Sequence, residues 1–329
     1  LVSRLKVMAR MDIAEKRLPQ DGVARVRIGE REIDIRASTL PVAEGERVVL
    51  RLLNRNTAIL PLSGLGLSEA TLGAWNRLIE EPNGILVVSG PTGSGKTTTL
   101  YAALQRLDKS RANILTIEDP IEYQLADIGQ MQVKPKIGLT FAGGLRHILR
   151  QDPDVILVGE IRDLETAEIA VRASLTGHLV FSTLHTNDAP NAVVRLSDMG
   201  VEPYLVAACL RAVLAQRLVR RLCPACRRPA APDAALFRSA GRPVPAGVWT
   251  TAGCPACREG FKGRLGLFEL MVVNAPLAEA IRAERPNPGA LRDLAVRNGM
   301  ATLLDDGLDK LAGGLTSPSE LWRAIGRPE

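Results

Sequence analysis

Aromatic residues are scarce in this sequence: Phe, Trp and Tyr together make up 3% of its 329 residues. Hydrophobic residues still account for 46%, so the cores must be built from Leu, Val, Ile and Ala. No apolar run approaches the roughly 20 residues that a membrane-spanning helix needs. The chain begins at Leu1 with neither an initiator Met nor the apolar region of a signal peptide. We therefore interpret it as a fragment whose upstream part is missing.

A strong excess of charge of one sign is also absent. The net charge is +6 and the pI is about 9.3, while 24% of the residues are charged, which makes large-scale disorder unexpected. A mildly basic surface suits nucleic acid, acidic lipid and acidic protein equally well. A nucleic-acid motor would be favoured by a basic stripe with interleaved aromatics, and the sequence has none. We therefore expect no nucleic-acid partner.

Cysteine is rare, and four of the five cysteines form two CxxC pairs. The pairs are Cys223 with Cys226 and Cys254 with Cys257. This pattern suits a reduced, cytosolic, metal-binding context better than two disulfides or a redox pair. Four thiolates in a tetrahedron match the geometry that Zn²⁺ prefers and leave no open position, so the predicted zinc site is structural. The fifth cysteine, Cys209, falls in a predicted helix and is expected to be a small buried residue.

Residues 1–56 carry the pattern of a small α+β domain. Apolar and polar residues alternate over 25–28 and over 33–36, and residues 29–31 between them predict a hairpin turn. The run 47–53 predicts a third strand of the same sheet. Residues 57–66 then predict a linker.

Residues 67–222 change to short buried strands that alternate with helices, which predicts a mostly parallel, doubly wound α/β sheet. The expected strands are 85–89, 114–118, 155–159 and 179–183, and a helix is expected over 204–217. Residues 223–265 are rich in Cys, Pro and Gly and predict a module organised by a metal, with a flexible excursion between the CxxC pairs. Residues 266–329 predict a C-terminal helical region, with helices over 277–282, 289–298 and 319–325.

A phosphate-binding loop joins the first of these strands to a helix. The sequence GPTGSGKT fits the pattern GxxxxGK[ST], with an apolar strand leading in and a helix leading out. The glycines let backbone N–H groups close around phosphates, and the helix N-terminus favours negative charge. Lys96 is expected to reach the β- and γ-phosphates of ATP or GTP, and the Thr97 hydroxyl to ligate Mg²⁺. The predicted nucleotide-binding residues are Gly90, Pro91, Thr92, Gly93, Ser94, Gly95, Lys96, Thr97 and Thr98.

Carboxylates follow two later strands. Glu118 ends the strand 114–118, and Glu160 follows the strand 155–159. The carboxyl ends of parallel strands form the edge where ligands bind in such sheets. A carboxylate beside the γ-phosphate can orient the attacking water, while Mg²⁺ offsets phosphate charge. His185 follows the strand 179–183 at the same edge, where it can sense the γ-phosphate or hydrogen-bond to a carboxylate.

The motifs together resemble the type II secretion and type IV pilus assembly ATPases. The run RQDPDVILVGEIRDLETAEIAVRASLTGHLVFSTLHTND over 150–188 is similar to the Walker B and His-box region of that family, and TIEDPIEY to its Asp box. Further matches are KVMARMDIAEKRLPQDG, IDIRASTLP, GERVVLRLL, the tetracysteine segment and GRLGLFEL, so nearly the whole chain is covered. The type II secretion branch is the most similar.

The resemblance implies an assembly and a function. It implies a RecA-like P-loop ATPase domain in a homo-hexamer of two-lobed subunits, which hydrolyses ATP with Mg²⁺ and powers pseudopilus assembly and protein export. Implied partners are inner-membrane platform proteins, so the motor would be cytoplasmic and peripheral to the inner membrane, touching it only through partners. A type IV pilus extension ATPase is the alternative. A nucleic-acid translocating ring ATPase and a catalytically silent adaptor are further alternatives from other classes.

The resemblance also implies roles for single residues. Glu160 matches the catalytic carboxylate, Glu118 the Asp-box carboxylate near Mg²⁺ and water, and His185 the His-box histidine. The arginines expected to reach the phosphates are Arg36, Arg51 and Arg195. Arginine suits this task because its planar fork of donors matches phosphoryl oxygens. From strand alternation alone, the first two arginines could instead simply face solvent.

Two positions depart from common patterns. Gly159 stands where many Walker B motifs carry an aspartate for Mg²⁺, which is usual for this family and leaves the metal to Thr97, phosphates and water. Val23 stands where the family usually has an arginine after QDG. If that arginine matters in the family, either its role is redundant in this chain or the activity is reduced.

Overall fold

The computed structural model describes residues 1–29, 31–54, 60–283 and 286–326. The chain divides into two compact units, the first made of residues 1–59 with 122–124 and the second of the rest. Part of the predicted linker 57–66 lies outside the described residues, as does Glu30 of the predicted hairpin turn. None of the described helices combines the length and the apolar character that crossing a membrane requires.

The first unit is a helix on a three-stranded antiparallel sheet. Its elements are α1 (Val2–Met8), β1 (Gln20–Ile28), β2 (Arg31–Val42) and β3 (Gly45–Asn54). The sheet order β1-β2-β3 confirms the predicted small sheet, including its third strand. Its hydrophobic core is small, because the buried apolar residues are Ala9, Ala24 and Ala37, with Met11 and Ile35 packed against them.

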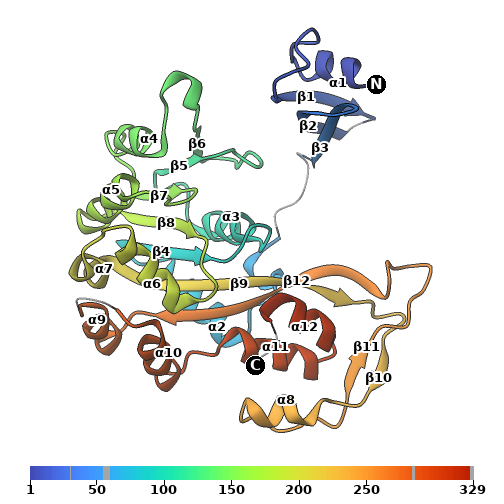
Figure 1. The fold of residues 1–329 in the computed structure, drawn as a ribbon. Coiled ribbons are helices and arrows are strands. Elements are labelled where there is room, and N and C mark those ends of the chain that lie inside the picture. The colour runs from blue at the N-terminus through green and yellow to red at the C-terminus, as the bar shows by residue number, and fades with distance from the viewer. Residues whose placement is uncertain (30, 55–59, 284–285, 327–329) are drawn as a thin grey trace. The chain divides into compact units, whose positions relative to one another are not determined.

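The second unit is built on a seven-stranded sheet in the order β12-β9-β4-β8-β7-β5-β6 (Figure 1). The strands are β4 (Gly84–Ser89), β5 (Ile114–Glu118), β6 (Gly129–Gln132), β7 (Val155–Val158), β8 (Leu179–Leu184), β9 (Leu210–Leu222) and β12 (Phe261–Val272). All neighbouring pairs are parallel except β12 with β9. The doubly wound α/β fold is therefore confirmed, and each of the four predicted strands lies within a residue of its observed bounds.

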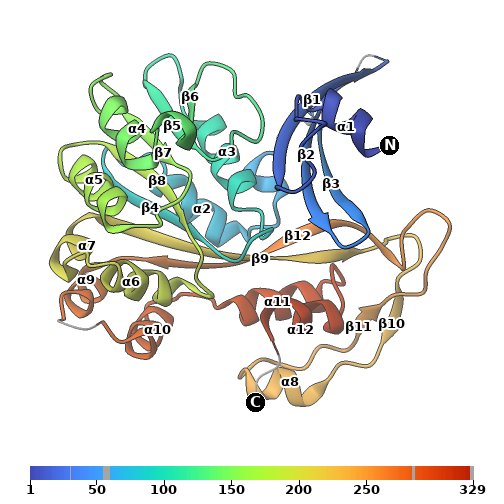
Figure 2. The same ribbon diagram turned by 45° about the horizontal axis from the view of Figure 1, so that its top comes forward.

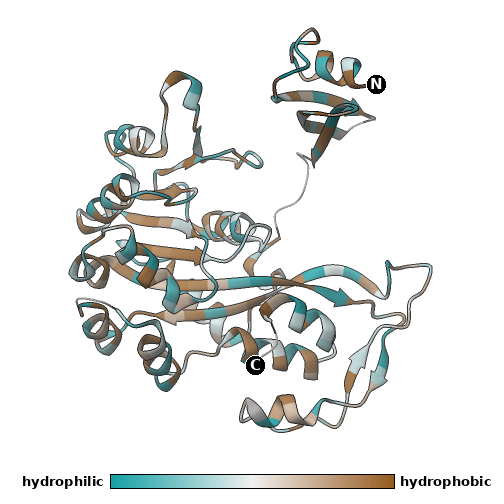
Figure 3. Cartoon of the chain, in the orientation of Figure 1, coloured by the Kyte–Doolittle hydropathy of each residue, from teal (hydrophilic) through white to brown (hydrophobic). Residues whose placement is uncertain are grey.

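Helices cover both faces of this sheet, because the central strands are buried on both sides. The helices before β9 are η1 (Leu62–Gly64), α2 (Glu69–Leu78), α3 (Lys96–Arg106), η2 (Pro135–Ile137), α4 (Phe141–Ile148), α5 (Leu164–Leu175), α6 (Ala189–Asp198) and α7 (Pro203–Cys209). Ile85 and Val87 of β4 belong to one large core shared with α4 to α7, while Leu86 and Val88 are buried on the opposite face. Figure 3 shows the central strands as predominantly hydrophobic. Such continuous apolar strands are typical of parallel sheets.

The predicted helix over 204–217 is wrong beyond Cys209. Helix α7 ends at Cys209, and Leu210 begins β9, which pairs with β4 on one side and β12 on the other. Leu, Ala, Gln and Arg favour helix locally, but β4 pairs with β9 as far as Ala215 and β12 pairs with it over 212–222, so tertiary context overrides propensity. Cys209 itself is buried as predicted, at 2% exposed, and burial raises the pKa of its thiol to about 11.

The C-terminal region is only partly helical. Strand β12 crosses the predicted boundary at residue 265 and pairs antiparallel with β9 over most of its length. The helices that follow are α9 (Ala275–Ile281), α10 (Pro288–Arg297), α11 (Leu303–Ala312) and α12 (Pro318–Ile325). Figure 2 shows α11 and α12 lying along β9 and β12. The three predicted helices are confirmed, and α11 is an additional one.

The stretch between the CxxC pairs is folded, not a flexible excursion. It contains β10 (Arg228–Ala230), α8 (Ala234–Ser239) and β11 (Val248–Thr250), with β10 and β11 paired antiparallel. Its apolar residues Leu236, Phe237 and Val248 are buried in one core with residues of α11 and α12. The expectation failed because the periodicity of so short a helix and two three-residue strands is too brief to be read from sequence.

This shared core leads to a stability prediction. Phe237 is 3% exposed, so Phe237→Ala should lower the free energy of unfolding by about 3–5 kcal/mol through lost burial and a cavity. Val244→Ala, at a 37% exposed site of the same stretch, is the control and should change it by less than about 0.5 kcal/mol. Urea unfolding measures both. Equal, small effects would show that the stretch does not pack on the C-terminal helices.

Candidate nucleotide site

The loop between β4 and α3 has a backbone that only glycine adopts easily. Gly90, Gly93 and Gly95 have φ angles of 148°, 79° and 89°, in the region that L side chains rarely enter. A Cβ atom on Gly90 would lie 2.5 Å from the carbonyl oxygen of Gln216. Gly95 is the N-cap of α3, so the unpaired N–H groups of the first helical turn face the loop. The loop is therefore a ready anion cradle.

Strand β9 holds the loop in place through Gln216, which is 1% exposed. Its Nε2 donates to the Ser94 carbonyl at 2.6 Å, and its Oε1 accepts from Thr99 Oγ1 at 2.8 Å. One buried amide thus connects the loop, α3 and β9. Gln216 was not predicted from sequence, because the residues 204–217 were expected to form a helix, which gives Gln216 no reason to face the loop.

Lys96 turns back over the loop that precedes it. Its Nζ donates to the carbonyls of Gly90 at 2.8 Å and Pro91 at 3.2 Å. Burial lowers the pKa of Lys96, the nearby Glu160 carboxylate opposes this shift, and the Arg217 guanidinium reinforces it. The ammonium therefore lies close enough to Glu160 and Arg217 for their charges to act on it.

Two neighbouring strands bring Glu160 and His185 together, as the sheet order requires. Glu160 Oε2 lies 3.6 Å from His185 Nε2, and Glu160 Oε1 lies 2.5 Å from a guanidinium nitrogen of Arg162. The Glu160 side chain is 13% exposed, so it keeps some access to the site. Burial lowers the pKa of His185, with the Lys96 charge adding to the effect and Glu160 opposing it. The pKa of His185 therefore lies below its ordinary value of 6.5, which favours the neutral imidazole at pH 7.

Glu118 occupies a different setting, although it also ends a strand at this edge. It is 3% exposed, and its carboxylate accepts hydrogen bonds from Tyr101, Thr116 and Gln130. The next residue, Asp119, is exposed, and its charge helps to raise the pKa of Arg162 after the larger contribution of the Glu160 hydrogen bond. The structure thus gives the two predicted carboxylates unlike surroundings.

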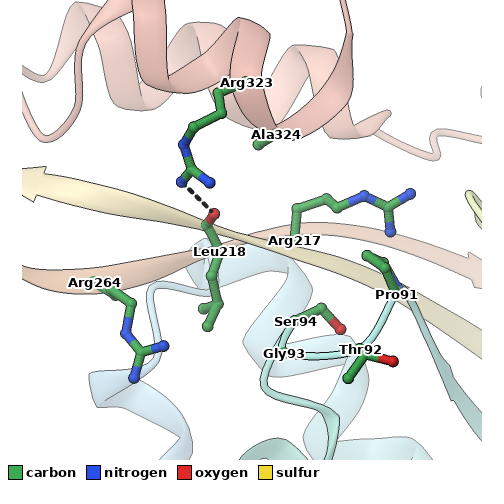
Figure 4. A pocket seen from close by; sticks show the side chains of 9 residues that line it. All are labelled: Pro91, Thr92, Gly93, Ser94, Arg217, Leu218, Arg264, Arg323 and Ala324. Atoms are coloured by element: carbon green, nitrogen blue, oxygen red, sulfur yellow. Dashed lines mark hydrogen bonds between the residues drawn. The ribbon is translucent and has the colours of Figure 1, made fainter. Parts of the chain in front are cut away.

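A pocket of about 240 Å³ opens beside the loop (Figure 4). Its lining residues are Pro91, Thr92, Gly93, Ser94, Arg217, Leu218, Arg264, Arg323 and Ala324. Three guanidinium groups from β9, β12 and α12 therefore surround one side of the loop, and none of them was predicted. Arg217 also donates to the Asn187 carbonyl at 2.8 Å, next to the segment that carries His185. Arg323 is paired with Glu320 of α12, so the positive charge that suits a phosphate-bearing ligand comes from Arg217 and Arg264.

The three predicted phosphate arginines lie in two places. Arg36 and Arg51 are directly opposite each other on β2 and β3 of the first unit, so they share one face of its sheet. Val23 of β1 is directly opposite Arg36, which places the departure from the family pattern in the same row. Arg195 is exposed in the last turn of α6 in the second unit.

The four CxxC cysteines converge, and this group can hold a metal ion. Their Sγ atoms lie within 4.8 Å of one another, with distances of 4.0 Å for Cys223–Cys254, 3.7 Å for Cys226–Cys257 and 3.5 Å for Cys254–Cys257. A tetrahedron with metal–sulfur bonds of about 2.3 Å has sulfur–sulfur edges of about 3.8 Å. A disulfide would bring two sulfurs to about 2.05 Å. The cluster therefore fits a tetrahedral metal.

The parallel sheet, the glycine loop before α3 and the carboxylate at the edge of a neighbouring strand define a P-loop NTPase fold. The chain belongs to the family described as Type II/IV secretion system protein, whose profile matches residues 1–323.

Curated relatives carry type II secretion names. The chain is 54% identical over 327 residues to the type II secretion system ATPase E of Vibrio cholerae serotype O1, covering 98% of this chain and 64% of that protein. It is also 54% identical over 324 residues to the type II secretion system protein E of Dickeya dadantii, covering 98% and 65%. The chain thus spans about two thirds of the length of these relatives.

Solved structures share the fold. The crystal structure of the pilus retraction motor PilT with bound ADP has a TM-score of 0.67 and 28% identity, covering 95% of this chain and 78% of that one. The Legionella pneumophila ATPase DotB has a TM-score of 0.68 at 23% identity, covering 92% and 76%, which shows the common fold alone.

Proposed function

We propose that this chain is the ATP-hydrolysing core of a type II secretion motor that drives pseudopilus assembly and protein export. The observation that carries the proposal is the meeting of Lys96, Glu160 and His185 at the P-loop, an arrangement suited to γ-phosphate hydrolysis. The family and the names of the curated relatives support the secretion system as the setting. The ADP bound to the related PilT supports an adenine nucleotide.

The loop and Lys96 would bind the phosphates. Within residues 90–98, the backbone N–H donors would come mainly from residues 95–98 at the start of α3. The Lys96 ammonium would exchange its bonds to the Gly90 and Pro91 carbonyls for phosphate oxygens. Thr97, at the start of α3, would hold Mg²⁺. When bound, Mg²⁺ offsets negative charge on the phosphates.

Glu160 would orient and deprotonate the attacking water as general base. Its carboxylate is paired with Arg162 and lies 3.6 Å from His185, so the Arg162 pair sets its direction before a nucleotide arrives. His185 would remain neutral and hydrogen-bond to Glu160, keeping the carboxylate available for the water.

The assembly is part of the proposal. We infer a division into a small α+β domain (1–56), linker (57–66), ATPase domain (67–222), tetracysteine module (223–265) and C-terminal region (266–329). Arg36, Arg51 and Arg195 would reach the phosphates in a homo-hexamer, coupling the chemistry to movement of the first domain. The ring would act in the cytoplasm, peripheral to the inner membrane, and transmit motion to platform proteins there.

The main test of the site is Glu160→Gln. The substitution keeps the shape and removes the negative charge and the basicity, so ATP turnover should fall at least about 100-fold while ATP affinity stays within about three-fold. Steady-state phosphate release and binding of a fluorescent ATP analogue measure the two quantities. Glu165→Gln, at an exposed glutamate of α5, is the matched control. Unchanged turnover in Glu160→Gln would remove Glu160 from its role.

The lowered pKa of His185 sets a pH dependence. Neutral histidine predominates above its pKa, which lies below the ordinary value of 6.5. As the pH falls through this pKa, His185 gains a proton and pairs with Glu160 as a cation, so turnover should be level from pH 7 to 8 and decline below 6.5. In His185→Asn the part of the decline due to this group should disappear. An acid limb with a midpoint above 7 in the parent protein would contradict the assignment.

The tetracysteine cluster would hold a structural Zn²⁺, because four thiolates fill its coordination. The purified protein should contain about one equivalent of zinc, and Cys226→Ser should lose it. Cys209→Ala, which changes the cysteine outside the cluster, should keep the metal. Loss of the metal should also affect the C-terminal helices, because the core of the module is shared with α11 and α12. Elemental analysis measures the zinc content of each variant. A full equivalent of zinc retained in Cys226→Ser would contradict the four-thiolate site.

A further inference from the structure

A buried hydrogen-bond network lies between α3 and the end of β5. Tyr101 of α3 is 0% exposed and Glu118 is 3% exposed. The Tyr101 hydroxyl donates to Glu118 Oε2, while Thr116 Oγ1 donates to Oε1 at 2.6 Å and Gln130 Nε2 donates to the same oxygen at 3.1 Å. Three protein donors, from α3, β5 and β6, therefore converge on one carboxylate.

The network is one helical turn from the side of α3 where Mg²⁺ is proposed to bind. Thr97 and Tyr101 are four residues apart on α3, so they lie on the same face of the helix. An interaction that fixes Tyr101 therefore also fixes the helical turn that carries Thr97. The hydrogen bond from Tyr101 to Glu118, at the end of β5, is such an interaction.

The main chain at Glu118 is also held by neighbouring segments. Its carbonyl accepts from the Val133 amide at 2.9 Å. A Cβ atom on Gly159 would lie 3.3 Å from Glu118 Cα, so the segment that leads to Glu160 packs directly against this backbone. Glu118 therefore stands between the helix of the P-loop and the strand end that carries the proposed base.

This setting is unlike that of a metal ligand. A carboxylate accepts about four hydrogen bonds, and three of those positions are used by protein donors. Mg²⁺ keeps several waters and needs open space for them, which a 3% exposed side chain does not offer. The exposed carboxylate at this strand end is Asp119.

We propose that Tyr101 and Glu118 are positioning residues that act as one unit: their hydrogen bond holds the Thr97 turn of α3 in register with the strand end that carries Glu160, and Glu118 does not contact the metal. The kinetic effect of this hydrogen bond rests on the proposed ATP hydrolysis. The structural connection between α3 and the end of β5 does not depend on it.

The experiment compares Tyr101→Phe, Glu118→Gln and the double variant in the full chain. Tyr101→Phe removes one hydroxyl and leaves the ring in its cavity, and Thr116→Val serves as a second conservative variant if Glu118→Gln fails to fold. Tyr204→Phe, at a 59% exposed tyrosine of α7, is the matched control. The readouts are kcat, KM, the Mg²⁺ concentration that gives half-maximal rate, the Mg²⁺ dependence of binding of a fluorescent ATP analogue, and Tm.

The positioning role predicts parallel behaviour. Both single variants should lower kcat by about five- to twenty-fold with KM changed less than about three-fold, because geometry and not binding is lost. The double variant should be no slower than the slower single variant by more than about two-fold, since the two residues act through one bond. The Mg²⁺ requirement should agree within about three-fold between the two single variants.

Two results would overturn the proposal. One is a Mg²⁺ requirement raised ten-fold or more in Glu118→Gln but not in Tyr101→Phe, which would make Glu118 a metal-side group. The other is a Tyr101→Phe protein indistinguishable from Tyr204→Phe in every readout. If the parent protein assembled as hexamers shows no turnover, the proposed function fails. The Mg²⁺ dependence of analogue binding then still distinguishes a shift shared by both variants from a shift confined to Glu118→Gln.

Discussion

The P-loop depends on a backbone conformation with positive φ angles at Gly90, Gly93 and Gly95, which residues with a side chain rarely adopt. The buried side-chain amide of Gln216 holds this loop against β9. The loop then directs its N–H groups inward at the start of α3, and Lys96 is folded over them. Everything else in the candidate site is arranged around this point. The parallel order β4-β8-β7-β5 brings the ends of four strands to the same edge, so residues distant in sequence become neighbours without further design.

Charge balance at this edge explains why the site holds together. The Lys96 ammonium, the Glu160 carboxylate and the Arg162 guanidinium alternate in sign, while His185 stays neutral because burial and nearby cations lower its pKa. Arg217 and Arg264 add positive charge in the pocket beside the loop, where Arg323 is paired with Glu320. Such an excess of cations is suited to a polyphosphate with its own negative charge. Glu118, by contrast, is withdrawn into the protein and connects secondary-structure elements.

Much of the site could be predicted from sequence because its signals are local. The P-loop has fixed spacing, Glu160 and His185 directly follow apolar strands, and the cysteines have recognisable knuckles. In the structure, Glu160 and His185 lie close to each other near the P-loop, and the four cysteines form one cluster. Arg217 and Gln216 were missed because the strand that carries them has a composition that favours helix, and its pairing with β4 and β12 is visible only in three dimensions. The engagement of Glu118 by Tyr101 is likewise a contact between distant segments, which no spacing in the chain reveals.

Steady-state Mg-ATPase activity tests the proposed function most directly, measured on purified protein with its oligomeric state recorded and in the presence and absence of single-stranded or duplex DNA. A secretion motor should hydrolyse ATP at a rate that rises as hexamers form and does not change with DNA. Absence of turnover in assembled hexamers, or strong stimulation by DNA, would contradict the proposed function, and the second result would place the chain among nucleic-acid motors.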